Sequence, residues 1–523
     1  MLKRLLSFCL LLTAGAAAAQ TPTWSTDVAA IVYNNCATCH RSGGIAPFPL
    51  MTYNDAVAQA SAMNADVQSG AMPPWPPDPT YSHMAHERLL SAAQKAKIAA
   101  WVAAGTPQGN PNLAPPQPVF SNNGDLPGTA NLTVQIPTYT SPAATTDMYR
   151  CFVLNTGQSV DKYITAFEAI PGNRGIVHHV LVFADTTGMA TQLDAQDPGP
   201  GYTSFGGIGT NNAIMLGGWV PGSSPVAYPQ GFGVKLPHNA KIVVQIHYPA
   251  GTAGETDSTR IRFFFSSAPS VRDVLILPVL NHNTNISPAL VIPANTVRSF
   301  TEHFDLNLGP DFSLLGVAPH MHLLGQHINA FGVTPLGDTQ RYISIPEWEF
   351  HWQGFYLLKQ IKKVPNGTQI YSQATYDNTV NNPENPSSPP QNVTAGEATT
   401  NEMMITYFVI TTYQPGDENI LIDTTTPTAI TNQPYYRSAE LLQPYPVPAK
   451  SEVIAKLYFD KANTASLEVV NTAGQVVQEV FKNKALAEGY QTFAVPLNAL
   501  AAGMYQLRLQ TAAGVQVQKI IKQ

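Results

Sequence analysis

The stretch IVVQIHYPAG, residues 242–251, sets the pattern for most of the chain: a β-branched run leads directly into Gln245 and His247. β-branched residues favour strands, and successive side chains of a strand point to opposite faces, so Gln245 and His247 share one face. Similar strand-like runs recur from Pro118 to about residue 430, with no long amphipathic helix between them. The sequence therefore predicts a mainly β protein.

The composition allows several folded domains and excludes some classes of partner. The chain has 523 residues, of which 44% are hydrophobic, enough for about three to four domains of ~150 residues. Prolines (44) and glycines (37) favour turns and short strands over long helices. The net charge of −6 gives no electrostatic support for a nucleic-acid or anionic-membrane partner. Four cysteines in this length exclude a disulfide-rich scaffold.

The first 19 residues have the organisation of a secretory signal peptide. Lys3 and Arg4 precede a short apolar run from Leu5 to Leu12, and Ala17–Ala19 supply the small residues of a cleavage site. The run is shorter than the ~20 residues that a membrane-spanning helix needs, and no later stretch reaches that length. Residues 1–19 are therefore predicted to be removed on export, and the mature chain is predicted to lack a membrane span.

A proline-rich linker over residues 431–448 leads into a C-terminal segment of different character. Alternating apolar residues there predict a hairpin around a turn at 471–474. Further strands are predicted at Gln491–Val495 and Met504–Leu509.

This last segment resembles the C-terminal sorting domain of type IX secretion substrates. The stretches that carry the resemblance are NTAGQVV (471–477), EGYQTFAVPLNALAAGMYQLRL (488–509) and KIIKQ (519–523). It implies a small C-terminal β-sandwich over residues 449–523, recognition by the type IX secretion machinery, and a secreted or cell-surface location. The Tyr-Pro-Asn-Pro opening of such domains appears here as Tyr-Pro-Val-Pro at 445–448, and an ordinary appended β-sandwich is the alternative.

Near the N-terminus, Cys36-Ala37-Thr38-Cys39-His40 matches the attachment pattern of a c-type haem. The two thiols lie one helical turn apart, so each can form a thioether to one haem vinyl group, and His40 follows as the proximal iron ligand. A redox disulfide and half of a zinc site are the alternatives, but the chain has no second Cys-x-x-Cys pair. The motif therefore predicts one haem c bound by Cys36, Cys39 and His40.

Two helices are predicted around this motif, over Asp27–Asn35 and over Ala92–Ala103. The arrangement resembles a small class I cytochrome c over residues 20–110, followed by a proline-rich linker over residues 111–130. Met72, in a proline-stiffened loop, is the predicted sixth iron ligand, and a thioether there raises the reduction potential relative to a second histidine. The alternatives for this ligand are Met63, His83, Met84 and His86.

Three histidine clusters, counting the one in the opening stretch, stand at the ends of predicted strands. His320 and His322 share one face if they lie on a regular strand, which makes them a natural chelating pair. The adjacent His178 and His179 point to opposite faces of a regular strand, so they share a metal only if the strand begins irregularly. Imidazoles suit copper or zinc, and an added thioether favours Cu(I). Purely structural histidines are the alternative.

Five stretches, in order along the chain, resemble the copper type II, ascorbate-dependent monooxygenases, which include peptidylglycine α-hydroxylating and dopamine β-monooxygenases. The resemblance implies two tandem β-sandwich, jelly-roll-like domains over residues 131–270 and 271–430, each holding one copper and facing a solvent-filled cleft. The stretches are IVHHVLVF (176–183), VVQIHYPAG (243–251), APHMHLLG (318–325), ATYDNTVNNPENP (374–386) and NEMMITYF (401–408).

The resemblance also assigns roles within these stretches. Met403 is preferred to Met404 as a copper ligand because the family's methionine directly follows an acidic residue, here Glu402. Gln245 matches a glutamine beside the first copper, and Tyr407 matches a tyrosine near the second. The implied ligands are His178, His179 and His247 for an electron-transfer copper, and His320, His322 and Met403 for an oxygen-activating copper.

Two departures from the family pattern bear on the substrate. Peptidylglycine enzymes anchor a substrate carboxylate with an arginine and an asparagine, and the corresponding positions here hold Ala318 and Ile405. Without that charge-assisted clamp, a less polar substrate is expected.

Together these features predict a secreted, copper-dependent monooxygenase that uses O2 to hydroxylate a C–H bond of a small-molecule or peptide-like substrate. Two coppers and one haem c are the predicted cofactors, with electrons from ascorbate or another donor, or through the fused haem. A secreted haem and copper redox protein without hydroxylase activity is the alternative. A third reading is a cell-surface binding module with incidental clusters.

Overall fold

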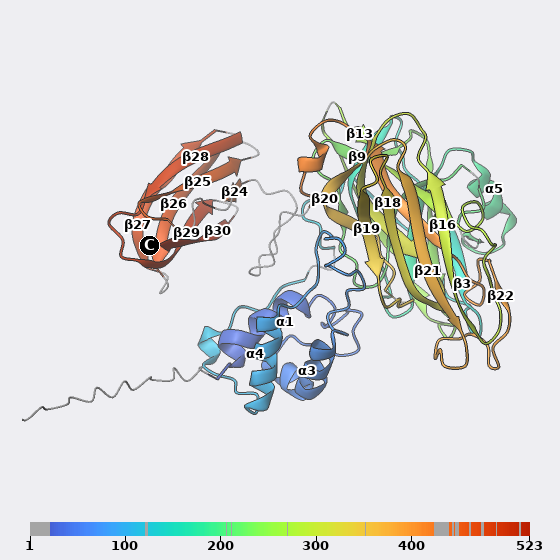
Figure 1. The fold of residues 1–523 in the computed structure, drawn as a ribbon, viewed down its shortest axis with the longest axis horizontal. Helices are drawn as coiled ribbons and strands as arrows, with labels where there is room; N and C mark the ends of the chain where they lie inside the picture. The colour runs from blue at the N-terminus through green and yellow to red at the C-terminus, as the bar shows by residue number, and fades with distance from the viewer. Residues whose placement is uncertain are drawn as a thin grey trace, which may run out of the picture. The chain divides into compact units, whose positions relative to one another are not determined.

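A computed structural model gives the fold of most of the chain (Figure 1). It forms two compact units, Met1–Ile430 and Thr431–Gln523, each described by itself below. The predicted signal peptide at 1–19 and most of the linker at 431–448 lie outside the described residues. Within the described part of the chain, no helix has the length and apolar character to span a membrane. The described residues are 21–120, 124–204, 207–210, 212–268, 270–350, 352–422, 439–441, 444, 449–459, 462–471, 475–487, 489–511 and 514–523.

The N-terminal part of the first unit is helical. The predicted helix over 27–35 is observed as a π-helical turn followed by an α-helix, and the helix over 92–103 is confirmed. Two further helices have no counterpart in the prediction; the first begins with a capping box between Thr52 and Asp55. Trp24 and Trp101 pack at the centre, with ring centroids 6.1 Å apart. The helices are η1 (Trp24–Val28), α1 (Ala29–Asn35), α2 (Tyr53–Ala58), α3 (Ala60–Ser69) and α4 (Ala92–Ala103).

The chain between α3 and α4 leaves the helical part and lies against the β-sandwiches, so residues 20–110 do not form a self-contained domain. The backbone N–H of Ala85 donates to the carbonyl of Leu357 at 2.7 Å. Met84 is 2% exposed and belongs to the apolar core of the second sandwich. A side chain packed in that core does not serve an iron in the helical part, which excludes Met84 as the alternative sixth ligand.

The first sandwich extends to Asp273, slightly beyond the predicted boundary at 270. One sheet has the order β1-β12-β4-β9-β13, with β8 paired to β4, and the other has the order β6-β3-β10-β5-β7. The run at 242–248 lies in β10, the central strand of the second sheet. Both its faces are buried, because Ile242 and Val244 belong to the main core and Val243 packs in a smaller cluster with Cys151 and Ala190. Its strands are β1 (Leu132–Gln135), β3 (Met148–Asn155), β4 (Lys162–Ile170), β5 (His179–Asp185), β6 (Tyr202–Thr203), β7 (Ile214–Trp219), β8 (Val226–Ala227), β9 (Phe232–Leu236), β10 (Lys241–Tyr248), β12 (Arg260–Phe265) and β13 (Arg272–Asp273).

Three smaller elements complete this sandwich. A short antiparallel pair lies apart from the two sheets, and one helix of eight residues follows β5. They are β2 (Tyr139–Thr140), β11 (Thr256–Asp257) and α5 (Met189–Gln196).

The second sandwich contains two four-stranded sheets, β14-β23-β17-β20 and β16-β21-β18-β19. The strands of the latter lie side by side in Figure 1. Exposed or half-buried and buried positions alternate along β21, as expected for a strand with one face toward the core. The strands of the second sandwich are β14 (Leu275–Asn281), β15 (Val291–Ile292), β16 (Thr296–Asp305), β17 (Phe312–His320), β18 (Gly325–Val333), β19 (Thr339–Ile345), β20 (Tyr356–Val364), β21 (Gln369–Asn378), β22 (Val393–Thr394) and β23 (Ile405–Thr412).

The C-terminal unit is a small two-sheet β-structure. The predicted hairpin is confirmed by the antiparallel pairing of β26 with β27, and the two further strands are confirmed as β28 and β29. The predicted turn residues 472–474 lie outside the described residues. The strands are β24 (Ala439–Leu441), β25 (Glu452–Phe459), β26 (Asn463–Asn471), β27 (Val476–Leu486), β28 (Gly489–Pro496), β29 (Gly503–Thr511) and β30 (Gly514–Lys522).

An ion pair connects the two sandwiches of the first unit. Arg272 on β13 donates to both oxygens of Asp417 at 2.6 and 2.7 Å, and Ser313 on β17 donates to the same carboxylate at 2.6 Å. Asp417 lies in η3 (Asp417–Asn419), after β23. Burial acts to raise the pKa of Asp417, but the hydrogen bonds from Arg272 and Ser313 outweigh burial and lower it.

Arg272→Ala should lower the free energy of unfolding by about 2 kcal/mol, because it leaves a mostly buried carboxylate without its cation. Since the pKa of Asp417 is lowered by folding, this stabilisation is present above the ordinary carboxyl pKa and is lost as the pH falls below it. Urea unfolding followed by tryptophan fluorescence, at neutral and acidic pH, measures both effects.

The matched control is Arg298→Ala, since Arg298 is exposed and makes one long hydrogen bond, at 3.4 Å, to the carbonyl of Val291. Equal stability losses for the two variants would contradict the role given to the Arg272–Asp417 pair.

Candidate metal centres

The first histidine cluster forms where two neighbouring strands meet. His247 on β10 lies directly opposite His179, the first residue of β5. His178 precedes that strand, and its backbone N–H donates to the carbonyl of His247 at 3.0 Å. The irregular strand start that a shared metal requires is therefore present. The centroids of the three rings lie 4.7 to 5.5 Å apart.

The nitrogen positions of this cluster fit a single metal ion. The Nδ1 of His178 lies 3.1 Å from the Nδ1 of His247 and 3.3 Å from the Nδ1 of His179. Ligand atoms from all three rings lie within 4.8 Å of one another. Two nitrogens that coordinate one ion at about 2.0 Å with tetrahedral angles are about 3.3 Å apart. Because imidazoles are good ligands for copper, these residues fit the copper predicted from the sequence.

Asp147 orients His247. Its Oδ2 accepts a hydrogen bond from the Nε2 of His247 at 3.0 Å, which directs Nδ1 toward the other two rings. Its Oδ1 accepts from the backbone N–H of Ala250 at 2.9 Å. Burial acts to raise the pKa of Asp147, but the hydrogen bonds with His247 and Ala250 outweigh burial and hold the pKa at about 2. A carboxylate behind a ligating histidine fixes its tautomer and increases its basicity.

The second cluster lies where β17 ends. His320 is the last residue of that strand, whereas His322 follows in the loop before β18. Their ring centroids are 5.1 Å apart, at an interplanar angle of 84°. The two rings therefore lie close together, as predicted, although only His320 belongs to the strand and His322 directly follows it.

Hydrogen bonds assign the ring protons of this second cluster. The Nδ1 of His320 donates to the Oε1 of Gln353 at 2.5 Å, and the Nδ1 of His322 donates to the carbonyl of Asn401 at 3.1 Å. Carbonyl oxygens only accept, so Nδ1 carries the proton in both rings and each Nε2 keeps its lone pair. The second cluster thus presents Nε2 atoms, whereas the first converges through Nδ1.

Burial keeps these histidines in the neutral form that binds metal. Desolvation lowers the pKa of His179 well below its ordinary value, and its histidine neighbours add to the effect. In the second cluster, burial lowers the pKa of His320 to about 4 and that of His322 to about 3. All three rings therefore keep a lone pair at neutral pH.

Glu402 ties the methionine of the second cluster to its histidines. Its carboxyl group accepts backbone hydrogen bonds from His322 at 2.9 Å, Leu324 at 2.7 Å and Met403 at 3.2 Å. Glu402 is fully buried, and burial raises its pKa to about 8. The hydroxyl of Tyr376 adds a hydrogen bond to the carbonyl of Met403 at 2.8 Å.

Both clusters line one cavity, which is partly open to solvent. Phe350 lies between them: its ring stacks on His178 with centroids 5.2 Å apart and meets His322 edge-on at 6.2 Å. No lysine or arginine is among the described residues that line this cavity. His178, His179, His320, His322 and Met403 line it together with apolar residues that include Leu181, Met215, Trp219, Phe355 and Ile405.

The resemblance also named three further residues, Gln245, Tyr407 and Met404. Gln245 and Tyr407 also line the cavity; the Gln245 amide nitrogen donates to two backbone carbonyls, at 3.0 and 2.6 Å. Burial raises the pKa of Tyr407 to about 12, so its phenol is protonated at neutral pH. Met404 is fully buried in the core of the second sandwich.

The Cys-x-x-Cys-His segment forms a compact turn. The backbone N–H groups of Cys39 and His40 both donate to the carbonyl of Cys36, at 3.1 and 2.9 Å. Both cysteines are free thiols. The Nδ1 of His40 donates to the carbonyl of Phe48 at 3.1 Å, which leaves Nε2 for an iron. These residues fit a covalently attached haem, while Met72, half-buried in the loop after α3, stays a prediction as sixth ligand.

Four residues that shape the clusters are absent from the sequence prediction: Asp147, Phe350, Gln353 and Tyr376. Each is distant along the chain from its partner; Asp147, for example, lies 100 residues from His247. Tyr376 lies within the stretch 374–386 that resembles the family, but nothing in that stretch assigns it a role, and no local pattern marks the other three. Glu402 did enter the sequence prediction, but only because the family's methionine ligand follows an acidic residue. Its role as a hydrogen-bond acceptor was not predicted.

Comparison with known families bears on two parts of the chain. Residues 132–253 match the model of the copper type II ascorbate-dependent monooxygenase, N-terminal domain. All three histidines of the first cluster fall in this region. The first sandwich is copper type II monooxygenase-like. Residues 443–523 match the secretion system C-terminal sorting domain, which indicates type IX secretion of this monooxygenase-like protein to the cell surface or out of the cell.

No curated protein matches the chain. Solved structures that match include the β-glucuronidases of Faecalibacterium prausnitzii (11% identity, 43% of this chain, 37% of that chain, TM-score 0.13) and Dictyoglomus thermophilum (9%, 49%, 44%, 0.13). β-Glucuronidase 3 of Bacteroides uniformis matches at 9% identity, with 49% of this chain, 31% of that chain and a TM-score of 0.14. The chain thus spans less than half the length of these enzymes, and the similarity supports no statement about its fold or function.

Asp147→Asn should weaken copper binding at the first cluster by about 10- to 100-fold, because the neutral amide neither orients His247 as firmly nor increases its basicity. Copper at the second cluster should be retained. Copper titration followed by electron paramagnetic resonance distinguishes the two sites.

Asp161→Asn is the matched control, since Asp161 hydrogen-bonds an exposed histidine, His238, at 2.7 Å and belongs to neither cluster. Unchanged copper affinity in Asp147→Asn, or an equal loss at both clusters, would rule out the orienting role.

Proposed function

We propose that this chain is a secreted copper monooxygenase that inserts one oxygen atom of O2 into a C–H bond of a largely apolar small-molecule or peptide-like substrate. The observation that carries the proposal is that two clusters with different donor sets line a single cavity. The family match of the first sandwich supports both the metal and the reaction class.

The donor sets suit different tasks. Bound to these clusters, two copper ions would supply the pair of one-electron steps that the reaction needs, with ascorbate or the fused haem as the electron source. His178, His179 and His247 form an all-imidazole set that accepts both oxidation states of copper. Met403 adds a soft thioether beside His320 and His322, which favours Cu(I).

The surrounding residues prepare the cavity for this chemistry. Glu402 and Tyr376 hold the backbone of Met403 in place. The apolar wall, with Phe350 between the clusters, surrounds the reacting centre with side chains of low polarity. The protonated phenol of Tyr407 can donate a hydrogen bond from its hydroxyl into the cavity.

The wall of the cavity also supports a largely apolar substrate. Ala318 and Ile405, at the positions where peptidylglycine enzymes anchor a carboxylate, both line it. Glu397 is the one carboxylate among the described lining residues, and it is an exposed residue. A substrate carboxylate would therefore meet no lysine or arginine among the described lining residues, and apolar contact has to supply most of the binding free energy.

The proposal includes one c-type haem on Cys36 and Cys39, with His40 as an iron ligand. Two observations support it. The two free thiols lie in one turn, and the hydrogen bond of His40 places its ring proton on Nδ1. Met72 is proposed as the sixth ligand.

Met403→Leu should abolish O2 consumption in the presence of ascorbate, because leucine keeps the volume of the side chain but removes the thioether. The copper–sulfur scattering in the X-ray absorption spectrum of the reduced protein should disappear with it. This spectroscopic measurement needs no knowledge of the substrate.

The neighbouring methionine provides the control. Met404→Leu is a volume-conserving change in the core of the second sandwich, with an expected stability cost below about 1.5 kcal/mol, and should keep both sulfur scattering and O2 consumption. Loss of sulfur scattering in Met404→Leu but not in Met403→Leu would reverse the assignment.

Replacing Cys36 and Cys39 together by serine should eliminate covalent haem, which the pyridine haemochrome spectrum of the denatured protein measures. Cys151→Ala, which removes a buried thiol of the first sandwich, should leave one haem per chain. Wild-type protein matured in a host that attaches c-type haem, yet free of covalent haem, would refute the assignment.

A further inference from the structure

The haem-attachment motif meets the first sandwich at a single turn. A Cβ atom built on Gly222 would lie 3.7 Å from the Sγ of Cys39. Gly222 has φ +74°, a left-handed conformation that favours glycine, and its carbonyl accepts a hydrogen bond from the guanidinium of Arg88. The turn after β7 is thus held against the second haem-binding thiol.

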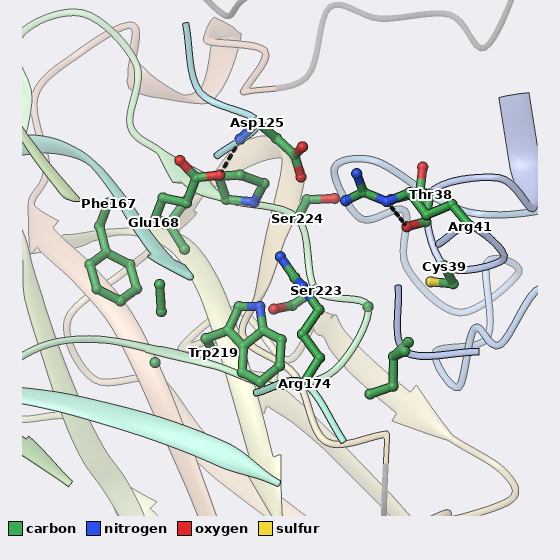
Figure 2. A pocket seen from close by; sticks show the side chains of 16 residues that line it. Thr38, Cys39, Arg41, Asp125, Phe167, Glu168, Arg174, Trp219, Ser223 and Ser224 are labelled. Atoms are coloured by element: carbon green, nitrogen blue, oxygen red, sulfur yellow. Dashed lines mark hydrogen bonds between the residues drawn. The ribbon is translucent and has the colours of Figure 1, made fainter. Parts of the chain in front are cut away.

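A cavity lies beside this contact (Figure 2). Thr38, Cys39 and Arg41 line it from the haem-attachment segment, and Arg174 and Trp219 line it from the first sandwich. In Figure 2 the indole of Trp219 lies next to the side chain of Arg174, whose guanidinium carbon is 6.0 Å from the ring centroid. The cavity is therefore lined by the haem-attachment segment on one side and by the first sandwich on the other.

Trp219 also reaches the copper cavity, because it lines that cavity as well as the one at Cys39. It is the last residue of β7, three positions before Gly222. In the sheet it pairs with Val180, which directly follows the copper-site residue His179. The buried Trp219, 7% exposed, is thus a lining residue that the cavity at Cys39 and the copper cavity share.

We propose that electrons pass from the haem on Cys39 to the copper of the first cluster, and that Trp219 couples the two centres. This inference rests on the proposed function, which supplies both metals. In the step, ferrous haem is oxidised to ferric haem and Cu(II) held by the histidines is reduced to Cu(I), with no bond made or broken. An enediol reductant such as ascorbate returns one electron to the haem for each electron passed on.

A competing route begins at the same turn. The Cβ position of Gly222 is 3.0 Å from the Cζ3 atom of Trp352, and the next residue, Gln353, holds His320 of the second cluster. Trp352, however, is not among the described residues that line the copper cavity. The shared lining by Trp219 and its strand pairing next to His179 favour entry at the first cluster.

The test uses the full-length secreted protein with haem and copper bound and fully oxidised. Under anaerobic conditions, a flash with a flavin photoreductant places one electron on the haem, and the decay of ferrous absorbance gives the transfer rate. Loss of the Cu(II) signal in electron paramagnetic resonance identifies the acceptor. Trp219→Leu should slow the decay by about tenfold or more, with haem spectrum, copper content and copper signal unchanged. Trp219→Phe, which keeps an aromatic ring in this packed position, should fall between Leu and wild type.

Trp352→Leu is the matched variant, since Trp352 touches the same glycine but leads toward the other cluster; it should transfer at the wild-type rate. Wild-type transfer in both Trp219 variants, or slow transfer only in Trp352→Leu, would overturn the route. A holoprotein that consumes O2 with ascorbate but shows no electron transfer from haem to copper refutes this inference alone. Wild-type protein that binds no copper refutes the proposed function as well.

Discussion

The buried carboxyl group of Glu402 is the constraint on which the second metal centre depends. A carboxyl group without contact to water has a large desolvation cost unless hydrogen bonds compensate for it. Glu402 meets that requirement by accepting from His322, Leu324 and Met403 at once. The same bonds fix the loop after β17 to the segment before β23, about eighty residues later in the chain. The hydrogen bonds that compensate the buried carboxyl group therefore also set the geometry of the second cluster.

Much of the architecture follows from local pattern. The β-branched run at 242–244 belongs to a central strand, and the alternation after residue 463 forms the hairpin of β26 and β27, because a strand pattern reports directly on which face is buried. The residues of the first cluster could also be named from the sequence, and the pairing of β5 with β10 makes His179 and His247 neighbours. In the second cluster the predicted pair His320 and His322 also lie close together, although His322 follows the strand and does not belong to it.

What sequence could not supply depends on contacts between distant segments. Asp147 and Gln353 contact histidines of the two clusters through side chains alone, and neither lies in a recognisable motif. The segment between α3 and α4 illustrates the same limit. It lies in the sequence between two helices of the N-terminal part, yet its Met84 packs in the core of the second sandwich. Hydrophobic pattern shows that a residue is buried, but not which core it joins.

The groups behind the two clusters differ in charge, and that difference would give the proposed electron flow a direction. Asp147, whose pKa is held at about 2, places a full negative charge behind His247, which favours the more highly charged Cu(II). His320 and His322 are instead backed by neutral carbonyl oxygens, from Gln353 and Asn401. With the soft sulfur of Met403 beside them, these rings favour Cu(I). Transfer of an electron from the first cluster to the second, where the proposed reaction would consume it, would therefore lower the free energy.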